Sequence, residues 1–281
     1  MKGLASKTEE IFHKVANLSC IQPYYLVGGT ALSLQLGHRA SEDLDFMQWR
    51  HNKNERMEVD WPRIEKELSQ IGKVENRDIL DIDHVLFQVD GVKFSFYACD
   101  KRSPIIREIP FTGNIRLANM EAIMSMKMEV MLRRSAYRDY YDIYCLLKEG
   151  LNIHQSIQQA VTYSGFRLKT KNILSILTNP SRFKVDESFK YLEPKYHVSA
   201  NDIAAYIKVC LRGIDKARII ERNGLNFLSA DIGGEHLLLE RISDDDMEKF
   251  KRQEMDIVDL CSTYFRFALE DDRGMPQGIK L

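Results

Sequence analysis

Hydrophobic residues in the N-terminal part of the chain recur with the spacings of both strands and helices. Alternating or continuous apolar runs predict strands, and apolar positions three or four residues apart predict helices. The predicted strands are 24–27, 43–47, 84–89 and 92–98, with 74–83 and 105–111 as either strands or irregular segments. The predicted helices are 6–17, 30–36 and 61–71. This mixture is typical of an α/β unit.

Helical spacing dominates the rest of the chain. The longest helical pattern covers 120–148, and Ser135-Ala136 within it marks a bend or a break. Further helices are predicted at 153–164, 172–177, 201–222 and 244–269, with 225–231 as a strand pair or a loop and 273–281 as a frayed tail. We therefore expect two domains, an α/β core over 1–118 and a mostly helical domain over 119–281.

Composition and charge indicate a soluble globular protein. Of 281 residues, 44% are hydrophobic and 29% are charged. The formal net charge of −1 excludes a chain-wide basic field, so any contact with nucleic acid must come from a local patch. The five scattered cysteines form no CxxC pair, which argues against a disulfide framework or a zinc site. Since the chain has neither a signal-peptide pattern nor an apolar run of membrane-spanning length, we expect a cytoplasmic protein without membrane contact.

One stretch near the N-terminus combines features that suit a phosphate and a metal ion. Two adjacent glycines, Gly28 and Gly29, let the backbone approach a phosphate closely. A helix beginning near Thr30 would point its N-terminal amides into the same space. Asp43 and Asp45 lie two positions apart on a predicted strand, so both carboxylates project from one face. This arrangement predicts a site for Mg²⁺ carrying a nucleoside triphosphate, the alternative being two solvated aspartates beside a glycine turn.

The full string over residues 26–46 reads Leu-Val-Gly-Gly-Thr-Ala-Leu, then Gly-His-Arg, then Glu-Asp-Leu-Asp-Phe. It resembles the motif of the polymerase-β-like nucleotidyltransferases and, in its particular residues, that of the AbiEii/AbiGii abortive-infection toxin family. The resemblance implies an α+β fold, with a mixed β-sheet flanked by helices followed by a mostly α-helical C-terminal domain. It also implies transfer of a nucleoside monophosphate from an NTP to an acceptor, for which the tRNA 3′ end is one candidate, and a cognate antitoxin as partner. The residues it assigns are Gly28, Gly29 and Thr30 for the triphosphate and Asp43 and Asp45 for Mg²⁺ or Mn²⁺.

The resemblance also implies a third carboxylate on a strand beside the two aspartates, where it helps to deprotonate the acceptor. The matching strand here is 92–97, and it carries Ser95 but no carboxylate. The general base is therefore unassigned. Either a downstream aspartate supplies it, or the protein is slow or catalytically degenerate.

A second charged motif follows in the long helical pattern. Lys127, then Arg138-Asp139 and a second aspartate, Asp142, resemble the later motif of the same family. The resemblance implies that Lys127 contacts the nucleotide phosphates and that Arg138 with Asp139 orders the site, with Asp139 as a candidate base. On one continuous helix Arg134, Arg138 and Asp142 would lie within about 60° of Lys127. The alternative interpretation is a solvated charged stripe with an internal Arg–Asp pair.

Two further basic features allow more than one interpretation. Arg39 either touches a phosphate or pairs with Asp43. Several cations on the helix predicted at 201–222 form either a local RNA-binding face or an ordinary solvated face; they are Lys208, Arg212, Lys216, Arg218 and Arg222. Transfer to a protein or small-molecule hydroxyl and a degenerate nucleotide-binding module remain alternatives to an RNA acceptor.

Overall fold

The computed structural model describes residues 2–52, 54–184 and 186–265, which form two compact units. The first unit comprises Met1–Ile176 and Arg182–His197, and the second comprises Leu177–Ser181 and the described residues from Val198 on. The division thus falls later than the boundary expected near residue 118. The helices that follow that position belong to the first unit because they pack against a helix of its N-terminal part.

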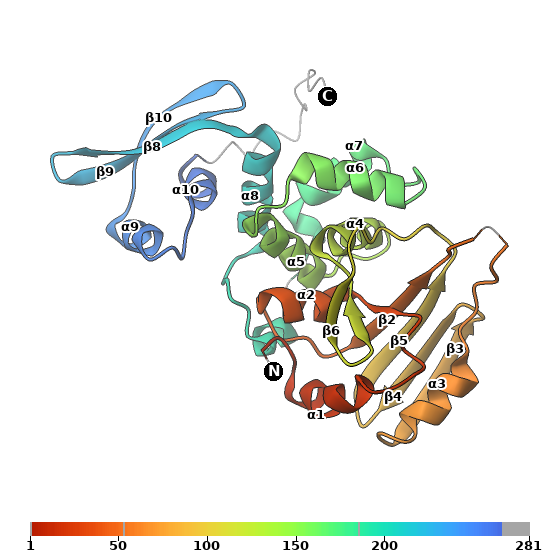
Figure 1. The fold of residues 1–281 in the computed structure, drawn as a ribbon. Coiled ribbons are helices and arrows are strands. Elements are labelled where there is room, and N and C mark those ends of the chain that lie inside the picture. The colour runs from red at the N-terminus through yellow and green to blue at the C-terminus, as the bar shows by residue number, and fades with distance from the viewer. Residues whose placement is uncertain (1, 53, 185, 266–281) are drawn as a thin grey trace. The chain divides into compact units, whose positions relative to one another are not determined.

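A seven-stranded mixed sheet forms the framework of the first unit (Figure 1). Its strands are β1 (Tyr25–Leu26), β2 (Leu44–Trp49), β3 (Val74–Asp81), β4 (His84–Val89), β5 (Val92–Cys99), β6 (Ile109–Thr112) and β7 (Ile115–Leu117). They lie in the order β3-β4-β5-β2-β1-β7-β6. The β2–β5 and β1–β7 pairs are parallel and the other neighbours are antiparallel. The mixed sheet confirms the fold class expected from the sequence.

Helices pack beside this sheet. The helices of the first unit are α1 (Ser6–Val15), α2 (Gly28–Leu36), α3 (Trp61–Leu68), α4 (Met120–Val130), α5 (Tyr137–Lys148), α6 (Ile153–Tyr163) and α7 (Thr170–Leu177), with a 3-10 turn at Glu187–Leu192. A second 3-10 turn, Pro180–Arg182, lies where the chain returns from the second unit to the first. The helical pattern over 120–148 is thus interrupted between α4 and α5, where Ser135 lies. Helix α2 contacts α4, α5 and β2, so the segment between β1 and β2 faces both helices (Figure 1).

The second unit contains a three-stranded sheet, whereas the sequence pattern allowed only a strand pair, as an alternative to a loop, at 225–231. Its elements are α8 (Ala200–Arg212), β8 (Ile214–Arg222), β9 (Leu225–Ile232), β10 (Glu235–Arg241), α9 (Asp244–Lys251) and α10 (Ile257–Tyr264). The prediction of a helix that extends to residue 222 was wrong. It ends at Arg212 because Gly213 follows with φ of 78°, and the next residues pair with β9 across a turn at Asn223-Gly224. The predicted tail at 273–281 lies outside the described residues.

The state of the cysteines and the presence of membrane-spanning helices can be examined in the described residues. All five cysteines are free thiols, and four of them are buried, as expected for a chain without a disulfide framework. Among the described helices, none combines the length and apolarity that crossing a membrane requires.

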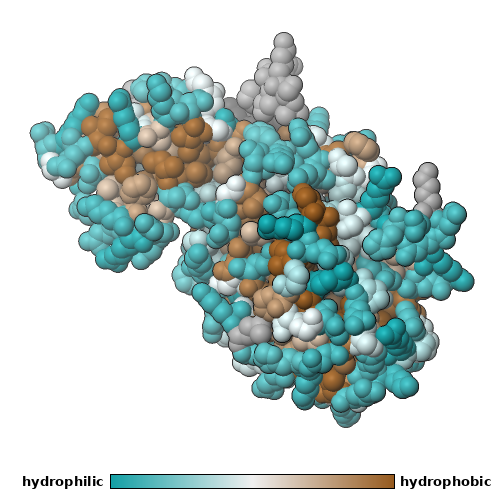
Figure 2. Space-filling view, in the orientation of Figure 1, coloured by the Kyte–Doolittle hydropathy of each residue, from teal (hydrophilic) through white to brown (hydrophobic). Residues whose placement is uncertain are grey.

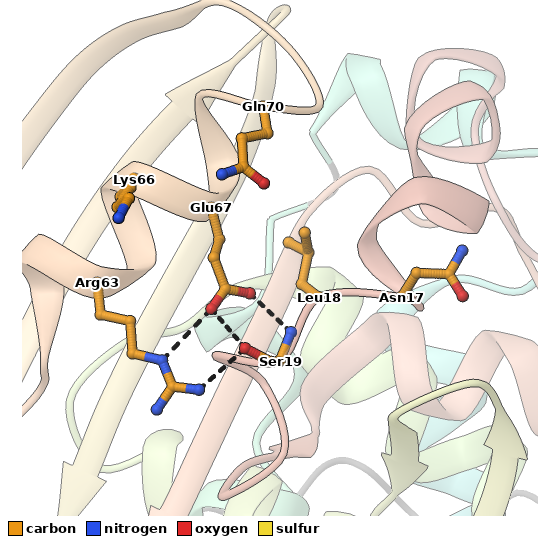
Figure 3. Close-up of a pocket in the computed structure, with 7 residues that line it drawn as sticks. All are labelled: Asn17, Leu18, Ser19, Arg63, Lys66, Glu67 and Gln70. Atoms are coloured by element: carbon orange, nitrogen blue, oxygen red, sulfur yellow. Dashed lines mark hydrogen bonds and ion pairs between the residues drawn. The ribbon is translucent and has the colours of Figure 1, made fainter.

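A polar pocket beside α3 is lined by a hydrogen-bonded carboxylate, that of Glu67 (Figure 3). Glu67 accepts hydrogen bonds of 2.6 Å from both the amide and the hydroxyl of Ser19 and one of 2.9 Å from the amide of Cys20. Arg63, one turn earlier on α3, lies 3.3 Å from the same carboxylate. Burial opposes ionisation of Glu67, but these hydrogen bonds outweigh it and lower the pKa to about 2. Glu67 therefore anchors α3 to the chain that follows α1.

The substitution Glu67→Gln tests this anchor. Because the folded state holds the pKa of Glu67 below its ordinary value of 4.5, the stabilisation is present above that pH and is lost as the pH falls towards 2. A hydrogen bond to a charged group contributes about 1.5–3 kcal/mol. We expect Glu67→Gln to lower the melting temperature by several degrees at pH 7 and by progressively less below pH 4. Glu10→Gln, at an exposed position of α1, is the matched control. A deficit that does not depend on pH would contradict the account.

Candidate active site

The glycine pair lies in the first turn of α2, and Gly28 lies beside Asp45. The helix begins at Gly28 itself, with Val27 as its N-cap, and not near Thr30. Gly28 has φ of 68°, and a Cβ there would lie 2.9 Å from the Oδ2 atom of Asp45. A Cβ on Gly29 would collide with the guanidinium of Arg39. Both positions therefore require glycine, and the first amides of α2 have no partner within the helix and are available to an anion.

The two aspartates lie where β2 begins. Asp43 immediately precedes the strand, and Asp45 is its second residue. The hydroxyl of Thr30 donates to the backbone carbonyl of Asp43 and lies 2.8 Å from the hydroxyl of Ser41. Since Thr30 is only 1% exposed, it fixes the loop that carries Asp43, which differs from the predicted contact with a triphosphate. The backbone thus holds both carboxylates beside the start of α2.

Proximity and burial set the charge state of Asp45. Burial raises its pKa, and the neighbouring carboxylate of Asp43 raises it further, to about 6. Lys93, Lys127 and Arg134 act in the opposite direction. A carboxylate held close to a like charge in a poorly solvated position is a common feature of functional sites.

Ser95 occupies the position of the expected third carboxylate. In the parallel β2–β5 pair it lies directly opposite Asp45. Its hydroxyl lies 3.3 Å from Nε2 of His84, on the next strand, β4. Burial lowers the pKa of His84, which favours the neutral ring at pH 7. A neutral imidazole, which the sequence analysis did not single out, therefore lies beside the serine.

A network of buried charges connects α4 and α5 to the loop after α2. The Nζ atom of Lys127 lies 2.8 Å from Asp139 and 2.5 Å from Asp142, whose carboxylates extend from α5. Arg39 makes a bidentate pair with Asp142 at 2.8 and 2.9 Å. His38 lies 2.8 Å from the same carboxylate. Of the two alternatives for Arg39, pairing with Asp43 is thus not observed, and its carboxylate partner is Asp142.

The charges in this network stabilise one another. Burial opposes ionisation of Asp142, but Arg39 and then Lys127 outweigh it and hold its pKa well below the usual range. Burial likewise disfavours the charged form of Lys127, yet Asp139 and Asp142 raise its pKa. Burial lowers the pKa of His38, whose Nδ1 has no hydrogen-bond partner among the described residues. These facts fit a neutral ring that donates through Nε2.

Asp139 is the second carboxylate of the network. Burial opposes its ionisation, but Lys127 and Arg134 lower its pKa. Arg134 forms this pair, with its Nε 2.7 Å from Asp139, whereas the sequence had assigned the pairing to Arg138. A carboxylate with a lowered pKa and two cationic partners is a poor proton acceptor. The geometry therefore argues against Asp139 as the general base.

A small pocket brings most of these groups together. Its lining residues are Gly29, Arg39, Ser41, Glu42, Asp45, Lys127, Arg134, Arg138, Asp139 and Leu192. Arg138 is exposed at its rim, and the glycine-rich helix start and the cations of α4 and α5 face the same space. The two motifs lie far apart in the sequence, and residues of both line this pocket. Sequence reasoning missed the central position of Asp142 and the contribution of His38, although both lie within the motifs it identified.

The donor set can be compared with the needs of Mg²⁺. No group of three or more His, Cys, Asp or Glu side chains suited to a metal occurs among the described residues. Mg²⁺ commonly uses one or two carboxylates together with substrate phosphates and water. Asp43 and Asp45 supply hard oxygen ligands of this kind, and the absence of a Cβ at Gly28 leaves space beside Asp45. The residues therefore fit a magnesium ion that arrives with a nucleotide.

Comparisons with known proteins agree with this geometry. A family model described as "Nucleotidyl transferase AbiEii toxin, Type IV TA system" matches residues 17–187. The match therefore includes the glycine pair, both aspartates and the charged network, and it ends before Val198, where the main segment of the second unit begins. An uncharacterized protein of Aquifex aeolicus (strain VF5) is 30% identical over 156 residues, which cover 53% of this chain and 69% of that protein.

Replacing Asp142 by Asn tests the buried network. The side chains of Asp142 and Arg39 are 0% and 3% exposed, so removal of the carboxylate charge leaves Arg39 and Lys127 insufficiently compensated. Breaking a buried pair in this way costs about 3–5 kcal/mol. We expect urea unfolding to show a loss of that size, with little change in the exposed control Asp100→Asn. A loss below about 1 kcal/mol, as for a surface pair, would show that these charges are solvated.

Proposed function

The chain belongs to the AbiEii nucleotidyl transferase toxin family, and on that basis we propose that it transfers a nucleoside monophosphate from an NTP to an RNA hydroxyl, with Mg²⁺ as cofactor. One observation carries this proposal. The carboxylate of Asp45, Gly29 at the start of α2 and a cluster of cations line one pocket, and Asp43 immediately precedes the strand that carries Asp45. The tRNA 3′ end is the acceptor that we favour, and we expect a cognate antitoxin to oppose the activity.

The proposed binding mode assigns the triphosphate to the positive side of the pocket. The amides of Gly28 and Gly29 and the dipole of α2 favour an anion. Lys127 is fixed in place by two carboxylates, and Arg134 and Arg138 lie nearer the solvent. Asp43 and Asp45 would hold Mg²⁺. When bound, Mg²⁺ neutralises phosphate charge and helps to align the α-phosphorus with the attacking oxygen.

In the proposed reaction, an acceptor hydroxyl oxygen forms a bond to the α-phosphorus while the bond from that phosphorus to the bridging oxygen breaks. Pyrophosphate leaves. The hydroxyl proton requires an acceptor, and we assign this role to His84, because burial favours its neutral form by lowering its pKa and because Ser95, 3.3 Å from its Nε2, lies opposite Asp45 in the β2–β5 register. Asp139 is less suited because its two cations hold it ionised and paired.

A transfer assay tests the proposal. The protein is incubated with each α-³²P-labelled NTP, Mg²⁺ and total RNA, and labelled RNA is resolved on a gel. We expect label on RNA that is abolished by EDTA. The variants Asp43→Asn and Asp45→Asn should lose about 100-fold or more, because each removes a charge that the transition state needs. Asp100→Asn, at an exposed site, is the control.

Other outcomes of the same assay would contradict particular parts of the proposal. Label on protein or on a small molecule would replace the RNA acceptor while preserving nucleotidyl transfer. NTP binding without transfer to any acceptor would indicate a degenerate binding module, as the serine at position 95 allows. A His84→Gln variant should lower kcat by about 100-fold or more with little change in the KM for NTP. Unchanged kcat would exclude His84 as the base.

A further inference from the structure

The sheet of the second unit has one face in a hydrophobic core and one face that α9 and α10 do not use. Ala217, Ile219 and Leu228 project into the core cluster that α9 and α10 complete. Because side chains alternate along a strand, the residues between them project from the opposite face. In β8 this outer face carries Lys216, Arg218, Ile220 and Arg222, the last at the turn into β9.

Charge is divided between the two faces. Lys216, Arg218 and Arg222 share the outer face, whereas Glu221 alternates with them on the other and Asp215 lies at an irregularity of the strand. On β10, Arg241 lies opposite Phe227 of β9, which in turn lies opposite Ile220. Four cations thus gather on one face in a chain whose formal net charge is −1. The acidic residue of this face, Asp231, is paired with His236.

These four cations are exposed and have no internal partner. Within the described residues, no ion pair or side-chain hydrogen bond involves Lys216, Arg218, Arg222 or Arg241. By contrast, Lys249 of α9 pairs with Asp245 of its own helix, and Arg252, just after that helix, pairs with Glu248. An unpaired cluster on a regular strand is therefore a local feature of this face, and it presents a positive surface to an anion.

Apolar side chains lie among the cations. Phe227, Ile220 and Leu225 are half-buried, and the first two form one row across the sheet with Arg241. Figure 2 shows hydrophobic residues gathered on this unit with hydrophilic ones around them. An aromatic ring on an open sheet, flanked by an arginine, is a surface on which a nucleic-acid base can stack.

We propose that the outer face of the β8–β9–β10 sheet binds a single-stranded segment of RNA, with the cations on the phosphates and Phe227 under a base. Alternate residues of a strand lie about 7 Å apart, so Lys216 and Arg218 are spaced to follow an extended backbone. The choice of RNA over other nucleic acids rests on the proposed function. The charge and the aromatic platform are observed on this face independently of that function.

An acidic protein would also satisfy the cations, but it leaves the aromatic row without a role. Base stacking uses the face of Phe227 and adds to affinity by a route that salt does not screen, whereas phosphate contacts are strongly salt-dependent. The two contributions can therefore be separated by combining substitution with a salt titration.

The test measures the fluorescence anisotropy of a labelled, unstructured 12-nucleotide RNA with the full chain, in EDTA and without NTP. The triple variant Lys216→Gln, Arg218→Gln, Arg222→Gln should bind about 10-fold or more weakly and reduce the slope of log K against log salt by about 2. Phe227→Leu should weaken binding by about 10-fold at an unchanged slope. The matched control Lys249→Gln, Lys251→Gln, Arg252→Gln removes the same charge from α9. Melting curves establish that each variant is folded.

Three results would overturn the proposal. They are wild-type affinity in the triple variant, an equal loss in the α9 control, and competition by polyglutamate as effective as by unlabelled RNA, which would favour an acidic protein partner. The outcome is independent of the transfer assay, because no metal or NTP is present. If the triple variant loses binding but no RNA is labelled in the transfer assay, the RNA-binding face is supported and the proposed function is contradicted. If the triple variant binds as the wild type does but RNA is labelled, the proposed function is supported and the RNA-binding face is contradicted.

Discussion

The candidate site depends on one buried carboxylate. Asp142 is fully buried on α5 and contacts Arg39, Lys127 and His38, which come from two other segments of the first unit. Removing such charges from water costs several kcal/mol per ion, and only close pairing recovers it. The loop after α2 and the middle of α4 are therefore both tied to one point on α5. Any arrangement that separated them would leave charges buried without compensation.

This constraint explains how the site divides its tasks. Arg39 is used inside the network, and its guanidinium comes so close to α2 that Gly29 has no room for a side chain. The first turn of α2 is thereby held beside Asp45 with its amides exposed to an anion. Lys127 is oriented by two carboxylates, while Arg134 and Arg138 extend towards solvent. The buried ions fix the geometry, and the exposed ones remain available to a ligand.

Much of this could be predicted from the sequence because local patterns carry it. The strand–glycine–helix unit and the two aspartates follow from short-range periodicity, and the position of Ser95 near them was implied by the family resemblance. The partner of Arg39 and the buried role of Thr30 could not be predicted from the sequence, because both depend on residues brought together by packing. The segment after Gly213 misled the helical interpretation for a similar reason. Its isoleucines fit either period, and the pairing partner that decides for a strand comes later in the chain.

The central claim is that the glycine-rich helix start, the two aspartates and the cations of α4 and α5 form one nucleotide site. The most direct test is a crystal structure of the protein with Mg²⁺ and a non-hydrolysable NTP analogue. The account predicts the metal between Asp43 and Asp45, and the triphosphate against the first turn of α2 within contact of Lys127 or Arg134. A nucleotide bound away from these residues, or a metal that does not contact either aspartate, would contradict it.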